Sequence, residues 1–207
     1  IQEWEDRKPV EYEERIGIGL EAGRRAAQEG RIYAAQFLRL QKDHGFVVYV
    51  EGLNGIGPQG DFMALGGEGR AARLERLEAT APDLGDPPRS LMKHGRFKLY
   101  LTTPALFSRG WLPSWLTPPT FTGLRNGLRL RLVAAAVGRP IPLSGFDMAL
   151  SQPKPMRRAV PAGSVYFFEL EDGDPQLAYR AFYFQSISEL SHEAGFGITL
   201  VGGWDYV

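Results

Sequence analysis

Three histidines are the first candidates for chemistry, because imidazole is the side chain that most readily exchanges a proton near neutral pH. They are His44, His94 and His192, and they lie far apart in the sequence. None has a ligand-type residue at metal spacing, and the chain has no cysteine to complete a zinc set. We therefore expect solvated loop histidines and no metal site. One alternative stays open: His94, beside Lys93, could be the general base of a metal-independent RNA cleavage.

A glycine-rich stretch, Gly66-Gly67-Glu68-Gly69-Arg70, resembles a phosphate-binding loop in its glycine content only. It lacks the Gly-Lys-Ser/Thr ending of such loops, and the chain has no nucleophile elbow of the Gly-X-Ser-X-Gly type. The acidic run Asp172-Gly173-Asp174-Pro175 reads as a polar turn rather than a catalytic carboxylate pair. The sequence thus predicts no catalytic residue and no cofactor, and a protein that is not an enzyme.

Clusters of basic residues are more informative. Arg70, Arg73 and Arg76 follow the glycines and alternate with small and apolar residues. Glycine-rich backbone brings amides close to a phosphate, and arginines beside it supply forked donors. Residues 125–139 carry arginines and no acidic residue, and residues 152–161 form a basic loop stiffened by prolines. The three clusters together favour contact with RNA.

The balance of charge limits how such contact could be made. The formal net charge is +0 at pH 7, which argues against a surface that is basic throughout. A local basic groove is compatible with it, and Phe146, Met148 and Met156 could pack on bases beside the cations. Two alternatives remain: a merely solvated surface, and contact with a protein partner. In the second case Trp111 and Trp115 would be the hot-spot residues.

The overall composition describes a folded domain. Hydrophobic residues make up 43% of the chain and aromatic residues 12%, enough for a core. There is no run of about 20 apolar residues, so we expect no membrane span and no membrane partner. The sequence shows no signal peptide and no cysteine, which fits a cytoplasmic location.

The elements that must position these residues are mostly strands. β-branched and aromatic runs predict strands at 15–20, 46–51, 97–102, 128–137, 164–170 and 196–201. Segment 31–40 fits either a helix or a strand, and the strand is favoured. Segment 187–194 predicts a helix, with Ser186 or Ser188 as its cap and Gly195 as its stop. Strands mixed with short helices, without regular alternation, indicate an α+β fold for which a ferredoxin-like (RRM-like) unit is the best match.

The order of several stretches resembles one known family. The stretches are 14–19 (Glu-Arg-Ile-Gly-Ile-Gly), 24–33, 62–70, 98–107 with Gly110-Trp111-Leu112-Pro113, 153–166, and the glycine-rich ending 195–204. Together they are similar to the third-subunit family of the Cmr complex, a type III-B CRISPR RNA-targeting effector, within the RAMP superfamily of RNA-binding proteins. Members are longer at the N-terminus, so the resemblance makes this chain a C-terminal portion.

The resemblance implies a fold and a domain layout. Residues 1–14 would be a linker or the end of a missing N-terminal module. Residues 15–207 would be a ferredoxin-like RAMP domain, an antiparallel sheet with short helices and long Gly/Pro-rich insertions at about 52–95 and 104–163. In the ending, Gly195, Gly197, Gly202 and Gly203 would let a backbone or an RNA strand approach closely.

The resemblance also implies partners and a site. The family holds the 5′ repeat-derived handle of the guide RNA and docks on the large polymerase-like subunit and an adjacent backbone RAMP subunit, while other subunits cleave the target. The RNA-binding residues carried over to this chain, with the neighbouring Arg73, are Gly66, Gly67, Arg70, Arg73, Lys154, Arg157 and Arg158.

Overall fold

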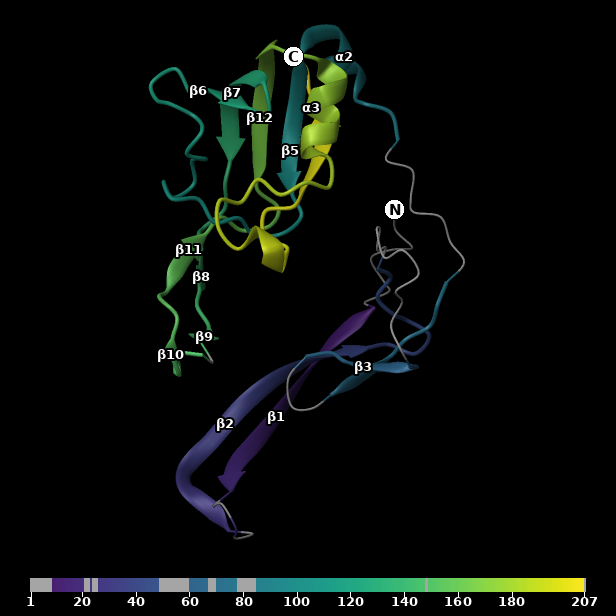
Figure 1. The fold of residues 1–207 in the computed structure, drawn as a ribbon, viewed down its shortest axis with the longest axis vertical. Helices are drawn as coiled ribbons and strands as arrows, with labels where there is room; N and C mark the ends of the chain where they lie inside the picture. Colours follow the sequence, from purple (N-terminus) through teal and green to yellow (C-terminus); the bar gives the residue numbers. More distant parts are fainter. Residues whose placement is uncertain are drawn as a thin grey trace. The chain divides into compact units, whose positions relative to one another are not determined.

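The structure is a computed structural model of the 207-residue chain and describes residues 9–20, 23, 26–48, 60–66, 70–77, 85–147 and 149–206. The chain divides into two compact units, Ile1–Ala81 and Pro82–Val207. The described part is mostly sheet with few helices (Figure 1), which confirms the mixed α+β class in its coarse form.

The first unit is built on a long antiparallel hairpin. Strands β1 (Val10–Leu20) and β2 (Ala27–Leu40) pair from Val10 opposite Leu40 to Ile18 opposite Ile32. The strands predicted at 15–20 and 31–40 are therefore confirmed, because the partner strand satisfies the backbone of a segment that is ambiguous by itself. β1 begins at Val10, inside the range 1–14 that the sequence suggests as a linker.

A short hairpin completes the described part of this unit. Strands β3 (Phe62–Ala64) and β4 (Ala71–Arg73) pair antiparallel, and the Leu65 amide donates to the Arg70 carbonyl at 3.1 Å. Residues 46–48 form no strand, so the strand predicted at 46–51 is wrong in its described part; residues 49–51 lie outside the described residues. The apolar run finds no partner strand in the described unit, and a strand needs one.

The second unit is organised by a five-stranded sheet. Its order is β13 (Thr199–Gly203), β5 (Arg96–Leu101), β12 (Val165–Asp172), β7 (Leu128–Ala136) and β6 (Thr122–Arg125), and all neighbours are antiparallel. The strands predicted at 97–102, 128–137 and 164–170 are confirmed within two residues, and 196–201 in part. The range 104–163, expected as an inserted loop, contains both β6 and β7.

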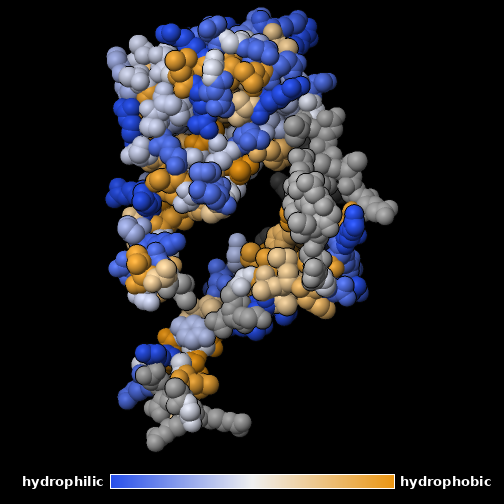
Figure 2. Space-filling model, viewed as in Figure 1, coloured by the Kyte–Doolittle hydropathy of each residue, from blue (hydrophilic) through white to orange (hydrophobic). Residues whose placement is uncertain are grey.

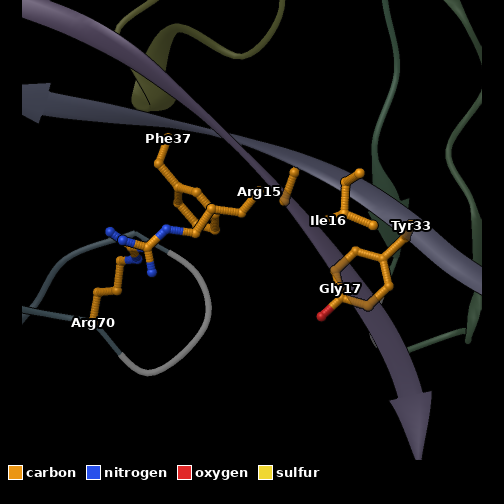
Figure 3. A pocket seen from close by; sticks show the side chains of 7 residues that line it. Arg15, Ile16, Gly17, Tyr33, Phe37 and Arg70 are labelled. Atoms are coloured by element: carbon orange, nitrogen blue, oxygen red, sulfur yellow. The ribbon is translucent and has the colours of Figure 1, made fainter. Parts of the chain in front are cut away.

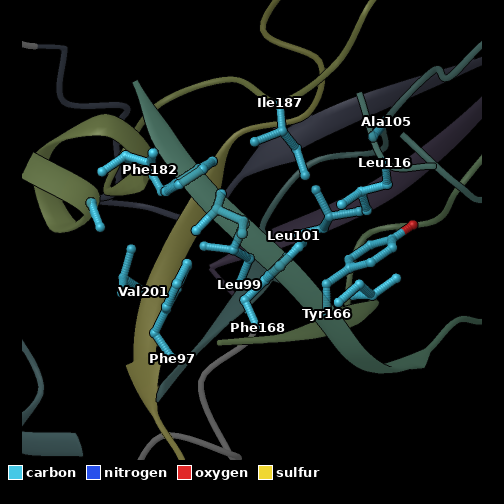
Figure 4. Packing of buried hydrophobic residues seen from close by; sticks show 14 of the residues in the cluster. Phe97, Leu99, Leu101, Ala105, Leu116, Tyr166, Phe168, Phe182, Ile187 and Val201 are labelled. Carbon is cyan, nitrogen blue, oxygen red and sulfur yellow. The ribbon is translucent and has the colours of Figure 1, made fainter. Parts of the chain in front are cut away.

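One face of this sheet carries the core. Alternation along β5 sends Phe97, Leu99 and Leu101 to the same side, where each is fully buried. Leu128, Leu130 and Leu132 of β7 and Tyr166 and Phe168 of β12 join them (Figure 4). Phe97 stacks on Phe168 with ring centroids 5.6 Å apart, and burial raises the pKa of Tyr166.

Two helices and one 3-10 turn accompany the sheet: α2 (Arg89–His94), α3 (Pro175–Phe182) and η1 (His192–Ala194). The acidic run is the polar turn expected, because the Asp174 carboxylate accepts the Gln176 amide at 3.0 Å and caps α3. α3 packs on the buried face through Ala178, Tyr179 and Phe182. No helix in the described residues is long and apolar enough to cross a membrane.

The helix predicted at 187–194 is wrong over residues 187–191; its end, His192–Ala194, forms one 3-10 turn, which Gly195 ends as expected. The Ile187 amide donates to the Gly197 carbonyl at 2.9 Å and the Glu189 amide to the Leu106 carbonyl at 3.0 Å, as in an extended chain. The Ser188 hydroxyl also accepts the Leu106 amide at 2.9 Å. These bonds to distant backbone replace the local ones that a helix needs, which is the usual competition at serine.

A two-stranded arm, residues 138–160, leaves the sheet between β7 and β12 (Figure 1). Strand β8 (Ile141–Leu143) pairs with β11 (Arg157–Ala159), and β9 (Phe146–Asp147) with β10 (Gln152–Pro153) further out. The arm is anchored at its base, where Ala105 and Val160 exchange backbone hydrogen bonds of 2.9 and 2.8 Å. It is therefore a continuation of two sheet strands.

The face of the sheet opposite the core carries an ion network and the C-terminal segment. Arg96 of β5 and Arg131 of β7 both pair with Glu169 of β12. The Trp204 indole N–H donates to the Phe97 carbonyl at 2.9 Å, and the Tyr206 hydroxyl donates to Glu169 at 3.0 Å. The hydrogen bond to Glu169 raises the pKa of Tyr206. The charges on this face thus largely pair with one another.

Candidate functional site

An open hollow of about 440 Å³ lies on one face of the β1–β2 hairpin (Figure 3). Register explains its composition, because Arg15 pairs with Ala35 and Gly17 with Tyr33, so that these side chains share a face. The residues that line it are Arg15, Ile16, Gly17, Tyr33, Ala35, Phe37 and Arg70. The small side chain of Ala35 leaves space that a larger one would fill.

Two guanidinium groups from separate segments converge on one ring in this hollow. The guanidinium carbon of Arg70 lies 3.8 Å from the Phe37 ring centroid, and that of Arg15 lies 5.7 Å from it. Figure 3 shows both groups on the same side of the hairpin, with the Tyr33 ring over Gly17. A methyl group at Gly17 would come within 2.3 Å of that ring, so the tyrosine position requires glycine.

The charge of this hollow is positive. Arg15 and Arg39 both pair with Glu13, at 2.6 and 3.1 Å, and these arginines lower the pKa of Glu13, chiefly through the hydrogen bond from Arg15. Among the described residues Arg70 forms no salt bridge, although its charge also helps to lower the pKa of Glu13. The arrangement offers donors and an aromatic face to an anionic, partly flat ligand such as a nucleotide.

The other predicted residues of the glycine loop are placed as follows. Gly66 turns the chain after β3 with φ of +83°, and Gly67 lies outside the described residues. The stretch joins two strands of a hairpin rather than a strand and a helix, so it is not a phosphate loop of the nucleotide-hydrolase type. Arg73, in β4, is exposed and pairs with Glu75 at 3.2 Å. The structure thus brings Arg70, but not Arg73, to the hollow.

The second predicted cluster lies on the arm. Arg157 pairs with Leu143 and Arg158 with Pro142 across β8 and β11, and both side chains are exposed. Lys154 is held at its backbone, where its amide donates to the Gly145 carbonyl at 2.8 Å. Figure 2 shows hydrophilic and hydrophobic residues side by side along the arm. The two predicted clusters belong to different units, and each is a candidate surface by itself.

Apolar side chains accompany the cations of the arm. Phe146 is 54% exposed and Met156 is 73% exposed, so both are available for contact, whereas Met148 lies outside the described residues. Leu150 at the turn is exposed as well. The expectation that Phe146 and Met156 pack on bases stays a prediction.

Several other sequence expectations can be compared with the structure. Trp115 is no exposed hot spot, because it stacks on Phe168 at 5.6 Å and packs against the core, whereas Trp111 is exposed. The close approach expected at Gly197 occurs within the chain itself, since a methyl group there would lie 2.5 Å from the Ser188 amide nitrogen.

The histidines show no catalytic environment. His94 ends α2, His44 contacts the Lys42 carbonyl at 2.9 Å, and His192 lies 3.5 Å from Glu193; all three are exposed. The described residues contain no group of three or more His, Cys, Asp or Glu side chains able to hold a metal ion.

Of the residues that line the hollow in the first unit, sequence reasoning selected only Arg70 and missed Arg15 and Phe37 among the others. Both lie in strands that the sequence predicts, but their meeting with Arg70 depends on the placement of the β3–β4 hairpin. The sequence gives one sign of the hollow. Arg15 and Gly17 alternate in one predicted strand, and Tyr33, Ala35 and Phe37 alternate in the other.

Comparison with known proteins gives a family and several matching chains in solved structures. The family model "CRISPR-associated protein (Cas_Cmr3)" matches residues 1–204. Comparison with curated proteins gave no match. Among solved structures, a chain in the cryo-EM structure of the type III-B Cmr-beta bound to cognate target RNA is 22% identical, with a TM-score of 0.43, over 76% of this chain and 45% of that chain. The chain thus spans less than half the length of that neighbour.

Proposed function

Because this chain belongs to the Cas_Cmr3 family of CRISPR-associated proteins, we propose that it is a non-catalytic, RNA-holding subunit of a type III-B CRISPR effector. Its ligand is the 5′ repeat-derived handle of the guide RNA. Its protein partners are the large polymerase-like subunit and the adjacent backbone RAMP subunit. The handle is bound by local basic surfaces, which agrees with a formal net charge of +0.

The observation that carries the proposal is the meeting of Arg15, Arg70 and Phe37 at an open hollow. A guanidinium that lies on a ring at 3.8 Å keeps its N–H edge directed outward, and Arg70 forms no salt bridge among the described residues. Such donors bind phosphate oxygens in pairs, and a ring beside them accepts a base.

The order of the sheet supports a ferredoxin-like fold for the second unit. In that fold the last strand lies beside the first and the third lies between the first and the second, as β13, β5, β12 and β7 do here. Helix α3 joins β12 to β13, as the second helix of that fold does. The connection from β5 to β7 departs from the pattern, because it is irregular and contains β6.

The arm supports a second RNA contact. Residues 138–160 carry Arg139, Lys154, Arg157 and Arg158 against one acid, Asp147, whose carboxylate already accepts the amides of Ala149 and Leu150 at 3.0 Å. The four cations of the arm are therefore not neutralised by carboxylates of the arm. An RNA strand would supply that charge in the form of phosphates.

The test is reconstitution of the complex with full-length protein and a handle-bearing guide RNA, with affinity measured by filter binding over a range of KCl concentrations. The double variant Arg157→Ala/Arg158→Ala should bind the guide about tenfold more weakly or worse. The slope of log K against log salt should become shallower by about 0.7 for each phosphate of a single strand that the variant no longer binds.

Arg180→Ala is the matched control, because Arg180 is an exposed arginine on α3 that belongs to neither cluster. It should leave both the affinity and the slope unchanged. A double variant with the affinity and slope of the wild type would contradict the assignment of the arm. Guide RNA that crosslinks to every other subunit but not to this one would favour a protein scaffold and would contradict RNA holding.

A further inference from the structure

A second hollow, of about 530 Å³, lies at the base of the arm. Its walls come from the loop before Leu112, from the end of β7 and from the end of β11. They consist of Gly110, Trp111, Ala135, Val137, Gly138, Pro140, Arg158, Ala159 and Val160. All of these residues belong to the second unit, and none except Arg158 is charged.

The hollow exists because β7 changes from large to small side chains. Leu128, Leu130 and Leu132 fill the buried side of the strand, but further along Ala135 stands opposite Tyr166, which is fully buried. An alanine there leaves unfilled the space that a leucine would occupy. The exposed Trp111 also lines the hollow.

The walls are fixed before any ligand binds. The Tyr166 hydroxyl donates to the Trp111 carbonyl at 2.6 Å, which ties the tryptophan backbone to the core. Val160 is held to Ala105 by the pair of backbone hydrogen bonds at the base of the arm. A preformed site avoids much of the ordering cost of binding.

The chemistry of the walls selects the ligand. Trp111 offers a wide ring that is 44% exposed, Ala135 and Val137 offer apolar contact, and Arg158 offers a cation at the rim. A flat, largely apolar group that carries a negative charge at one edge complements all three. A nucleobase with its phosphate has this shape and charge, and stacking on an aromatic ring is a common way to hold an unpaired base.

We propose that this hollow receives one unstacked nucleobase of the guide RNA, with the base against Trp111 and its phosphate on Arg158. This rests on the proposed RNA-holding function and adds a residue, Trp111, that sequence reasoning assigned to protein contact. RNA is favoured over an apolar protein side chain because Arg158 belongs to an arm that carries four cations against one acid, Asp147. Stacking accepts any base, so the site fixes the path of the strand rather than its sequence.

The experiment places the fluorescent base 2-aminopurine at each handle position in turn, in complexes reconstituted with full-length protein. Stacking on an aromatic ring quenches 2-aminopurine. In the wild type one position should show strong quenching. Trp111→Leu should relieve the quenching and weaken guide binding about tenfold, as removal of one stacking residue does, whereas Trp111→Phe should keep most of both.

Two further variants protect the test against misfolding and non-specific effects. Ala135→Met places a larger side chain in the hollow without changing Trp111, and it should abolish the same quenching. Tyr100→Leu is the matched control, because Tyr100 has the same 44% exposure but does not line the hollow. It should leave the quenching at that position intact.

The outcomes separate this proposal from the function on which it rests. If the wild type binds the guide tightly but no position is quenched in a manner that depends on Trp111 and Ala135, the base site is refuted and RNA holding stands. If Trp111→Leu instead releases a neighbouring protein subunit and leaves the quenching unchanged, the hollow is a protein contact and the proposal is again refuted. If the wild type does not bind the guide, both proposals fail.

Discussion

The guanidinium carbon of Arg70 lies 3.8 Å from the centroid of the Phe37 ring, although the two residues come from different hairpins of the first unit. An exposed cation–π contact of this kind is worth about 0.5–1 kcal/mol. The contact matters more for the position of the Arg70 side chain, because the Phe37 ring holds its guanidinium close to that of Arg15. The contact thus turns two separate strand surfaces into one cationic site.

Removal of this arginine should weaken RNA binding without unfolding the unit. For Arg70→Ala we expect several-fold lower affinity for the guide and a salt slope that is shallower by about 0.7, measured by filter binding of the reconstituted complex. Phe37→Leu should have a smaller effect, since the cation stays but is no longer oriented. Lys42→Ala, which removes an exposed cation outside the hollow, should bind the guide as the wild type does. If this control weakened guide binding as much as Arg70→Ala, the effect of Arg70 would come from the total charge of the protein and not from its place in the hollow.

The chain should not cut RNA. His94 is exposed at the end of α2, and the described residues place no carboxylate or second histidine in contact with it. We therefore expect labelled repeat RNA, incubated with the purified full-length protein in EDTA, to remain intact on a denaturing gel. Cleavage that disappears in His94→Ala would establish the endoribonuclease alternative and overturn this prediction.

Glu189 should make the second unit less stable in acid. Burial alone would raise the pKa of its carboxyl, but hydrogen bonds from the Ser108 amide and hydroxyl and the Ser114 amide outweigh burial and lower it. A lowered pKa contributes stability above the ordinary value of the group, and that contribution is lost as pH falls through the folded-state pKa.

For Glu189→Gln we expect a free energy of unfolding lower by about 1–2 kcal/mol at neutral pH, the worth of a partly screened charged hydrogen bond. The difference should close below about pH 4. Urea unfolding at several pH values measures it. Glu193→Gln, an exposed neighbour whose side chain is 74% exposed, serves as the control and should change little at any pH. A gap for Glu189→Gln that does not vary with pH would rule out the charge as its cause.

The sequence predicts strands well where one face is buried. In β5 the alternation of Phe97, Leu99 and Leu101 with polar residues allows only one interpretation, and the structure agrees. The ambiguous segment 31–40 is also a strand, as the sequence favours. These successes share a cause. When every second residue of a strand is buried, the alternation of apolar and polar residues can be read from the strand's own sequence.

Failures occur where distant backbone decides the local structure. Segment 187–194 has the cap and stop of a helix, yet Ser188 and Glu189 bond to residues 106–114 instead. Helix α3, by contrast, begins at Asp174-Pro175, where the sequence predicts only a turn. The candidate sites divide in the same way. Arginines beside glycines or prolines are visible in the sequence as charge, whereas only the fold places Phe37 beside Arg70 and Trp111 beside Arg158.

The position of β13 has a consequence for how the protein is made. β13 pairs with β5, about a hundred residues earlier in the chain, and Thr199 and Val201 complete the buried face. During synthesis the ribosome releases β5, β7 and β12 long before it releases their last neighbour. Until then one edge of β5 is unpaired in the nascent chain, and an unpaired strand edge can pair with another chain and aggregate or bind a chaperone. The edge of β5 is covered only after translation of residues 199–203 has finished.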